Sequence, residues 1–131
     1  MGILKSIFGK TDKVAKQETV SHIKWIPLTS LEQLKTIKNQ SKKEPVAIFK
    51  HSTRCGISSM VIKRFVSSFD ESLKDFKIYY LDLLTYRELS AEVGYEFQVL
   101  HQSPQLLVIK NQVAVAHASH YDIGQIDLKS F

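Results

Sequence analysis

The chain has 131 residues and a formal net charge of +5 at pH 7, and 44% of its residues are hydrophobic. This length and composition suit one soluble domain with a core of its own. No apolar run approaches the ~18 residues of a membrane span, and a single cysteine cannot form an internal disulfide, so we expect a cytoplasmic protein. The lysines are scattered and form no basic block interleaved with aromatic residues, which argues against nucleic-acid binding.

The first part of the chain differs in composition from the rest. Residues 10–21 are polar with little apolar periodicity, and the apolar start at 1–8 is too short for a signal-peptide core. We therefore expect residues 1–21 to form a flexible leader and residues 22–131 to form the domain. The domain is predicted to open with a short edge strand near 25–28, because Pro27 is poorly tolerated in a central strand.

The first predicted helix follows Thr29. Thr29 and Glu32 fit a capping box, in which each side chain bonds to a backbone N–H of the first turn. The predicted buried stripe of this helix is Leu31, Leu34 and Ile37. A polar turn at 39–44 ends the helix, and the apolar run at 46–50 predicts a central strand.

The second predicted helix begins at Gly56. Its apolar residues repeat every four positions, at Ile57, Val61, Phe65 and Phe69. A nearly continuous apolar strand at 76–83 follows, which is typical of a sheet covered on both faces. Thr85 and Glu88 fit a second capping box at the start of a third helix, whose expected buried residues are Leu89, Val93 and Phe97.

The last third of the chain predicts a hairpin and a short helix. The two hairpin strands are expected at 105–110 and 113–117, joined by a tight turn, and the helix at 124–130. Right-handed crossovers make the first three strands parallel, and the hairpin adds antiparallel strands. The element order therefore predicts an α/β fold: a thioredoxin-like mixed β-sheet with helices on both faces.

Cys55, the only cysteine, is the candidate catalytic residue. It lies between the central strand and the second helix, where backbone N–H groups and the helix dipole stabilise a thiolate. Arg54 adds a positive charge beside it. The alternative is a small, buried and inert apolar residue. With no second cysteine, an intramolecular resolving step is impossible.

Further residues are candidates for substrate binding or activation of the thiol. Gly56 permits close backbone approach, and Ser58 offers a hydroxyl to the thiolate. Pro104 directly precedes the first predicted hairpin strand, and an X–Pro bond can be cis at little cost. The resemblance to thioredoxin-like folds implies that this bond is cis and aims the backbone of Ser103 at an extended substrate, and we expect both. His51 is either a proton partner of the cysteine or a strand-end residue that hydrogen-bonds a loop.

Histidines raise the question of a metal site. His117 and His120 form a His-x-x-His pair, but one remote cysteine does not complete a recognised zinc spacing. We therefore expect no metal.

Three separated stretches carry a family resemblance. Residues 49–58 read FKHSTRCGIS, residues 101–105 read HQSPQ, and residues 117–121 read HASHY. In this order and spacing they resemble the F-K-H-S-T-x-C-x-I-S, S-P-Q and H-x-S-H-aromatic segments of the YtxJ-type monothiol bacilliredoxins, a thioredoxin-like family. The resemblance covers the chain from about Trp25 onward. Arg54 and Gly56 replace the threonine and proline of the family's Thr-Cys-Pro-Ile-Ser motif, which bears on substrate preference.

The resemblance implies an activity. Such proteins remove bacillithiol, a low-molecular-weight thiol, from mixed disulfides on client proteins, and Cys55 would be the nucleophile. The implied partners are S-thiolated client proteins and the small thiol, which is a cosubstrate, and no bound cofactor is expected. We expect a monomer that binds neither nucleic acid nor membrane.

Two alternatives stay open at this point. Cys55-Gly56-Ile57-Ser58 also resembles the Cys-Gly-Phe-Ser motif of monothiol glutaredoxins, which carry iron–sulfur clusters with glutathione, although their Gly-Gly pair near the last helix is absent here. The other alternative is a thioredoxin-like docking module in which the cysteine has no chemical role.

Overall fold

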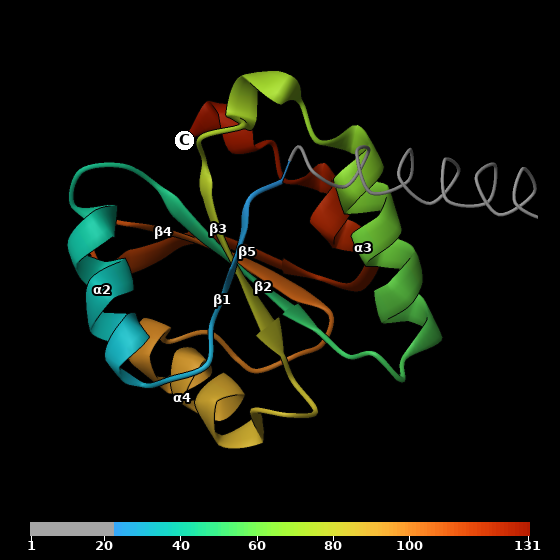
Figure 1. Ribbon diagram of the computed structural model, residues 1–131, viewed down its shortest axis with the longest axis horizontal. Helices are drawn as coiled ribbons and strands as arrows, with labels where there is room; N and C mark the ends of the chain where they lie inside the picture. Colours follow the sequence, from blue (N-terminus) through green and yellow to red (C-terminus); the bar gives the residue numbers. More distant parts are fainter. Residues whose placement is uncertain (1–22) are drawn as a thin grey trace, which may run out of the picture.

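The computed structural model describes residues 23–131, so the expected leader at 1–21 lies outside the described residues (Figure 1). The strands are β1 (Trp25–Pro27), β2 (Val46–His51), β3 (Lys77–Asp82), β4 (Gln105–Lys110) and β5 (Val113–Ser119). The α-helices are α2 (Glu32–Ser41), α3 (Gly56–Ser68) and α4 (Arg87–Phe97), and the short 3₁₀ helices are η1 (Glu71–Leu73), η2 (His120–Gln125) and η3 (Leu128–Ser130). None of the helices described is long and apolar enough to cross a membrane.

The five strands form one mixed sheet in the order β1-β3-β2-β4-β5. β3 pairs in parallel with both β1 and β2, whereas β4 is antiparallel to β2 and β5 is antiparallel to β4. The predicted parallel core and antiparallel hairpin are thus confirmed. All six residues of β2 are buried, which makes it the centre of the sheet.

Helices cover both faces of this sheet (Figure 1). Side chains of a strand alternate between the two faces, and β2 divides accordingly. Val46 and Ile48 pack with α2 and α4 in one core, and Ala47 and Phe49 pack with α3, η2 and η3 in the other. By the same alternation, the next two side chains, those of Lys50 and His51, point to opposite faces at the carboxyl end of β2, and both are polar.

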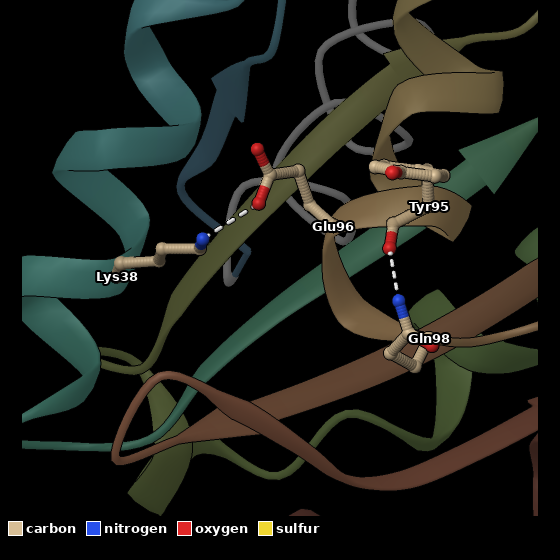
Figure 2. Close-up of polar contacts among 4 residues, drawn as sticks. All are labelled: Lys38, Tyr95, Glu96 and Gln98. Atoms are coloured by element: carbon tan, nitrogen blue, oxygen red, sulfur yellow. Dashed lines mark hydrogen bonds and ion pairs between the residues drawn. The ribbon is translucent and has the colours of Figure 1, made fainter.

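The helices α2 and α4 lie side by side and are joined by an ion pair. Lys38 Nζ of α2 lies 2.6 Å from Glu96 Oε2 of α4 (Figure 2). At the end of α4, Gln98 adopts a left-handed backbone conformation and its side-chain amide donates to the Tyr95 carbonyl at 2.8 Å (Figure 2). These contacts end α4 and direct the chain into the loop before β4.

The capping box predicted for the first helix is wrong. Leu31 is the N-cap of α2, and Gln33 Oε1 accepts hydrogen bonds from the backbone N–H groups of Thr29 and Ser30 at 2.7 and 3.0 Å. Gln33 thus takes the place predicted for Glu32, one residue further on. Leu31 consequently lies outside the helix and is 59% exposed instead of belonging to the buried stripe.

The second predicted capping box is also wrong, for a different reason. Tyr86 is the N-cap of α4 without a side-chain bond. Asp82, at the end of β3, accepts from the Leu84 backbone N–H at 3.2 Å and from the Thr85 hydroxyl at 2.8 Å. The carboxylate of the preceding strand therefore engages the hydroxyl that would otherwise cap the helix.

Two further predictions need correction. On α3, Val61 and Phe65 are buried, but Ile57 is 41% exposed because it lies in the first turn. The predicted C-terminal helix at 124–130 is replaced by two 3₁₀ helices, η2 and η3, separated by extended backbone at Ile126. η3 begins where Asp127 Oδ1 accepts from the Lys129 backbone N–H at 3.0 Å, which interrupts any continuous helix.

Gly94 of α4 is a point of close approach. A Cβ added there would lie 2.8 Å from the Val99 carbonyl oxygen, and the helix or the loop would have to shift. We expect Gly94→Ala to lower the free energy of unfolding by about 1–3 kcal/mol, measured by urea denaturation. The matched control is Gly124→Ala, because a Cβ at Gly124 meets nothing within 4 Å. Equal urea midpoints for the two variants would contradict the close approach.

Candidate active site

Cys55 is the N-cap residue of α3, and it is partly exposed. Two backbone hydrogen bonds hold it there: the Cys55 N–H donates to the Ser52 carbonyl at 3.2 Å, and the Cys55 carbonyl accepts from the Ser59 N–H at 3.0 Å. The first N–H groups of a helix have no partner within the helix, and the first turn of α3 contains no acidic residue. Among the described residues, this end of the helix therefore presents N–H groups that α3 itself does not use, together with the positive end of the helix dipole.

Ser58 lies beneath the cysteine loop and is fully buried. Its Oγ accepts a hydrogen bond from the Ser52 N–H at 3.0 Å and lies 2.7 Å from His51 Nδ1. Because the oxygen accepts from Ser52, the hydroxyl proton is available to the imidazole. The structure thus brings Ser58 together with His51 and Ser52, where it joins the end of β2 to the first turn of α3.

His51 occupies the strand-end position that the sequence left open. Burial lowers its pKa, and the Asp82 carboxylate on β3, its register partner, offsets part of that effect. The imidazole is therefore neutral near pH 7 and can accept the Ser58 proton at Nδ1. Its ring also lies 5.8 Å from the Tyr80 ring. These contacts favour the structural interpretation of His51 over a proton partner for the thiol.

The peptide bond between Ser103 and Pro104 is cis, which confirms that prediction. Lys50 of β2 pairs with Gln105 of β4, so Pro104 and the cysteine loop lie at the same edge of the sheet. The Pro104 carbonyl accepts from the His120 N–H at 3.0 Å. The Ser103 backbone is thereby placed at the edge where Cys55 lies.

Arg54 and Gly56, the neighbours of the cysteine, face open space. Arg54 is exposed, and none of the ion pairs formed by residues 23–131 includes it. A Cβ at Gly56 would meet no atom of the protein within 4 Å. The packing of the protein therefore does not require the close backbone approach expected at Gly56. Over the same described range, no three His, Cys, Asp or Glu side chains lie together as metal ligands would.

An apolar surface patch adjoins Cys55, and the sequence analysis missed it. The patch consists of Ile57, Met60 and Tyr121, which are 41%, 46% and 52% exposed. The Tyr121 hydroxyl lies 3.9 Å from Met60 Sδ, and the Arg64 guanidinium lies 5.6 Å from the centre of the Tyr121 ring. The positions of Ile57 and Met60 within the first two turns of α3 could have suggested it, but their apolar character indicated the core.

Lys50 was also missed, because the lysines were considered only as scattered charges and Lys50 was given no role within the predicted strand at 46–50. Lys50 is fully buried at the carboxyl end of β2. Its Nζ donates to the Ser90 carbonyl of α4 at 2.9 Å and lies 3.1 Å from His101 Nδ1. Burial lowers the pKa of Lys50 to about 8. The one available signal was its place at the end of an otherwise apolar central strand.

The fold and this site define a thioredoxin-fold protein with a thiol redox role. One solved structure, described as having a thioredoxin fold and an inferred oxidoreductase activity, is 31% identical with a TM-score of 0.64, over 76% of this chain and 85% of that one. A thioredoxin from Schistosoma mansoni aligns with a TM-score of 0.61 at 19% identity, over 82% of this chain and 95% of that one. A Malassezia sympodialis thioredoxin aligns with a TM-score of 0.55 at 21% identity, over 76% and 81%.

The sequence profile of the monothiol bacilliredoxin BrxC family matches residues 26–128. Because the match covers most of the chain, the protein belongs to this family. The family resemblance and the thioredoxin-like fold expected from the sequence are thus confirmed. Redox enzyme activity follows in general terms from the family and the fold.

The buried contacts of Ser58 make its removal costly. Ser58→Ala leaves the Ser52 N–H and His51 Nδ1 without their shared partner, and we expect a loss of about 1–3 kcal/mol in the free energy of unfolding. Ser59→Ala, at the next position of the same helix turn, is the control and should change it by less than about 0.5 kcal/mol. Urea denaturation measures both. Equal effects of the two substitutions would show that the Ser58 hydroxyl contributes nothing.

The buried ammonium of Lys50 predicts a pH dependence. Its pKa falls from 10.5 in the unfolded chain to about 8 in the folded protein. Between these values the unfolded chain binds the proton that the folded protein has lost, so the free energy of unfolding rises with pH. We expect this rise to amount to at most about 3 kcal/mol and to disappear in Lys50→Met.

Urea unfolding across this alkaline range measures the rise. Lys110→Met is the control, because Lys110 is exposed at the opposite end of the neighbouring strand β4 and should leave the rise in place. Other groups that titrate in this range contribute equally to the two proteins and cancel in the comparison. Parallel curves for the native protein and Lys50→Met would contradict the assignment.

Proposed function

We propose that the protein removes bacillithiol from mixed disulfides on client proteins by a monothiol mechanism in which Cys55 is the nucleophile. The observation that carries the proposal is a partly exposed sulfur at the N-terminus of α3, in a chain that has no other cysteine and belongs to the monothiol bacilliredoxin BrxC family. The client proteins and the small thiol are the partners of this reaction.

The exchange has two steps on one sulfur. The Cys55 thiolate attacks the bacillithiol sulfur of the mixed disulfide, the client sulfur leaves as a thiolate that takes up a proton, and a Cys55–bacillithiol disulfide forms. A second thiol from solution then attacks the bacillithiol sulfur of that disulfide and releases Cys55 as a thiolate. The oxidising equivalent thus passes from the client through Cys55 to the second thiol, which ends in a disulfide.

Two features beside Cys55 support a protein client and an anionic small thiol. The apolar patch of Ile57, Met60 and Tyr121 offers contact area to a folded partner, and large exposed apolar groups commonly mark interaction sites. Exposed Arg54, which is free of the ion pairs among the described residues, is available to a carboxylate of the small thiol. The cis-proline loop supplies backbone groups for an extended client segment.

The test is transfer of the adduct, followed by mass spectrometry of both proteins. A purified client carrying one bacillithiol is mixed with the reduced protein. We expect the client to lose the mass of the adduct and Cys55 to gain it, because the thiolate displaces the client sulfur. Cys55→Ser should leave the client modified, and Ser59→Ala, which keeps the sulfur, should transfer normally.

A client that keeps its adduct at every protein concentration would contradict the proposal. Anaerobic reconstitution with iron and sulfide, read by visible absorption, examines the cluster-carrier alternative with the same preparation. A stable coloured species together with no adduct transfer would assign the protein to that class instead.

A further inference from the structure

The buried ammonium of Lys50 joins three parts of the fold next to the site. Lys50 is in β2, its Nζ donates to the Ser90 carbonyl in α4, and it lies 3.1 Å from Nδ1 of His101 in the loop between α4 and β4. Ser90 is itself fully buried, and its Oγ lies 3.3 Å from the same His101 nitrogen. The ammonium therefore connects β2 and α4 to one residue of the loop.

That loop ends at the cis bond between Ser103 and Pro104, three residues after His101. Its amino-terminal side is held close to α4, since the Cβ missing from Gly94 would reach within 2.8 Å of the Val99 carbonyl. Gln105 Nε2 donates to the Leu100 carbonyl at 2.9 Å. His101 thus lies between the fixed start of the loop and the cis-proline that faces the cysteine edge.

The cis-proline end of the loop is incompletely bonded. Within residues 23–131, Ser103 Oγ and Gln105 Oε1 are buried without a hydrogen-bond partner. On the β5 side, Ser119 Oγ donates to Gln102 and the His120 N–H donates to the Pro104 carbonyl at 3.0 Å. On the β2 side, the contact from Lys50 to His101 is the charged one, and charge-assisted hydrogen bonds are the stronger kind.

Stability does not explain a lysine at this position. Both partners of the ammonium are neutral, because one is a carbonyl and the other is an imidazole nitrogen that accepts. A buried charge without an opposite charge is costly, and apolar residues of similar size often replace buried ions at no loss of stability. Val46 and Ile48, the other two residues of β2 whose side chains lie on the same face as that of Lys50, are apolar.

We infer that Lys50 is a positioning residue for the cis-proline loop: through His101 it fixes where the Ser103–Pro104 segment stands beside Cys55. The inference rests on the proposed function in one respect: the extended segment that the loop binds belongs to the S-thiolated client. Lys50 acts on client binding and does not contact the reacting sulfur atoms. His101 transmits the position, since it is the residue of the loop that the ammonium reaches.

The test changes His101, which is exposed, so that folding is not at risk. His101→Leu removes the acceptor. His101→Asn restores one, because the amide oxygen of Asn stands where Nδ1 stood. Lys50→Met removes the donor, and Lys110→Met is the matched lysine control on the exposed end of β4.

The first readout needs no substrate. Hydrogen exchange at the backbone amides of residues 100–103, 105 and 106 should become about tenfold faster in His101→Leu and Lys50→Met, which corresponds to the loss of one hydrogen bond to a charged group. It should stay near the native rate in His101→Asn and Lys110→Met. Unchanged exchange in His101→Leu overturns the inference, whatever the protein's substrate is.

The second readout separates binding from chemistry. In the adduct-transfer assay run with an excess of the second thiol, so that Cys55 turns over, the KM for the client should rise about five- to tenfold in His101→Leu, while kcat changes less than about twofold. The rate at which iodoacetamide alkylates Cys55 should not change, because a small reagent does not use the loop. A fall in kcat or in alkylation at unchanged KM would overturn the positioning role. If the native protein transfers no adduct, the proposed function fails and the exchange result alone decides the inference.

Discussion

The complete burial of β2 is the constraint from which the site follows. This strand is paired on both edges and covered on both faces, so every side chain it carries must be accommodated inside the protein. Four apolar residues satisfy this by packing, but the last two are polar. An unpaired buried polar group costs about 1–3 kcal/mol, and each of these two has a partner. Lys50 bonds to α4 and the loop before β4, and His51 bonds to α3.

Neither of these two anchors engages the sulfur of Cys55. The polar groups that could have engaged Cys55 are directed inward: the Ser58 hydroxyl and the Ser52 N–H bond to each other, and the His51 ring accepts from Ser58. The cysteine loop is thereby fixed from below, while Cys55 is partly exposed at the helix N-terminus. The contacts that hold the loop therefore do not engage the thiol of Cys55, which stays available for the proposed exchange.

The sequence could predict what depends on local pattern and on chain order. The apolar segments and their order along the chain predicted the sheet and its helices. The place of Cys55 in that order predicted a cysteine at a helix N-terminus, and the place of Pro104 predicted the cis bond. The caps failed because they depend on a shift of one residue, as at Gln33, or on a competing carboxylate, as at Asp82. Lys50 could not be assigned, because its partners lie 40 and 51 residues away and only the packed fold brings them together.

In the proposed function one sulfur performs both steps of the exchange, and this imposes a demand on the surface around it. Without a resolving cysteine in the chain, the client must leave before a second thiol reaches the adduct on Cys55. Contacts to the client must therefore be specific yet limited, and they must lie beside the sulfur without covering it. The apolar patch on α3 and η2 and the cis-proline loop lie at the end of the sheet that carries Cys55, and Cys55 is partly exposed there. In the proposed function, the specificity of client binding then depends on how firmly the cis-proline loop is held. This dependence accounts for a buried lysine beside the loop in an otherwise apolar strand.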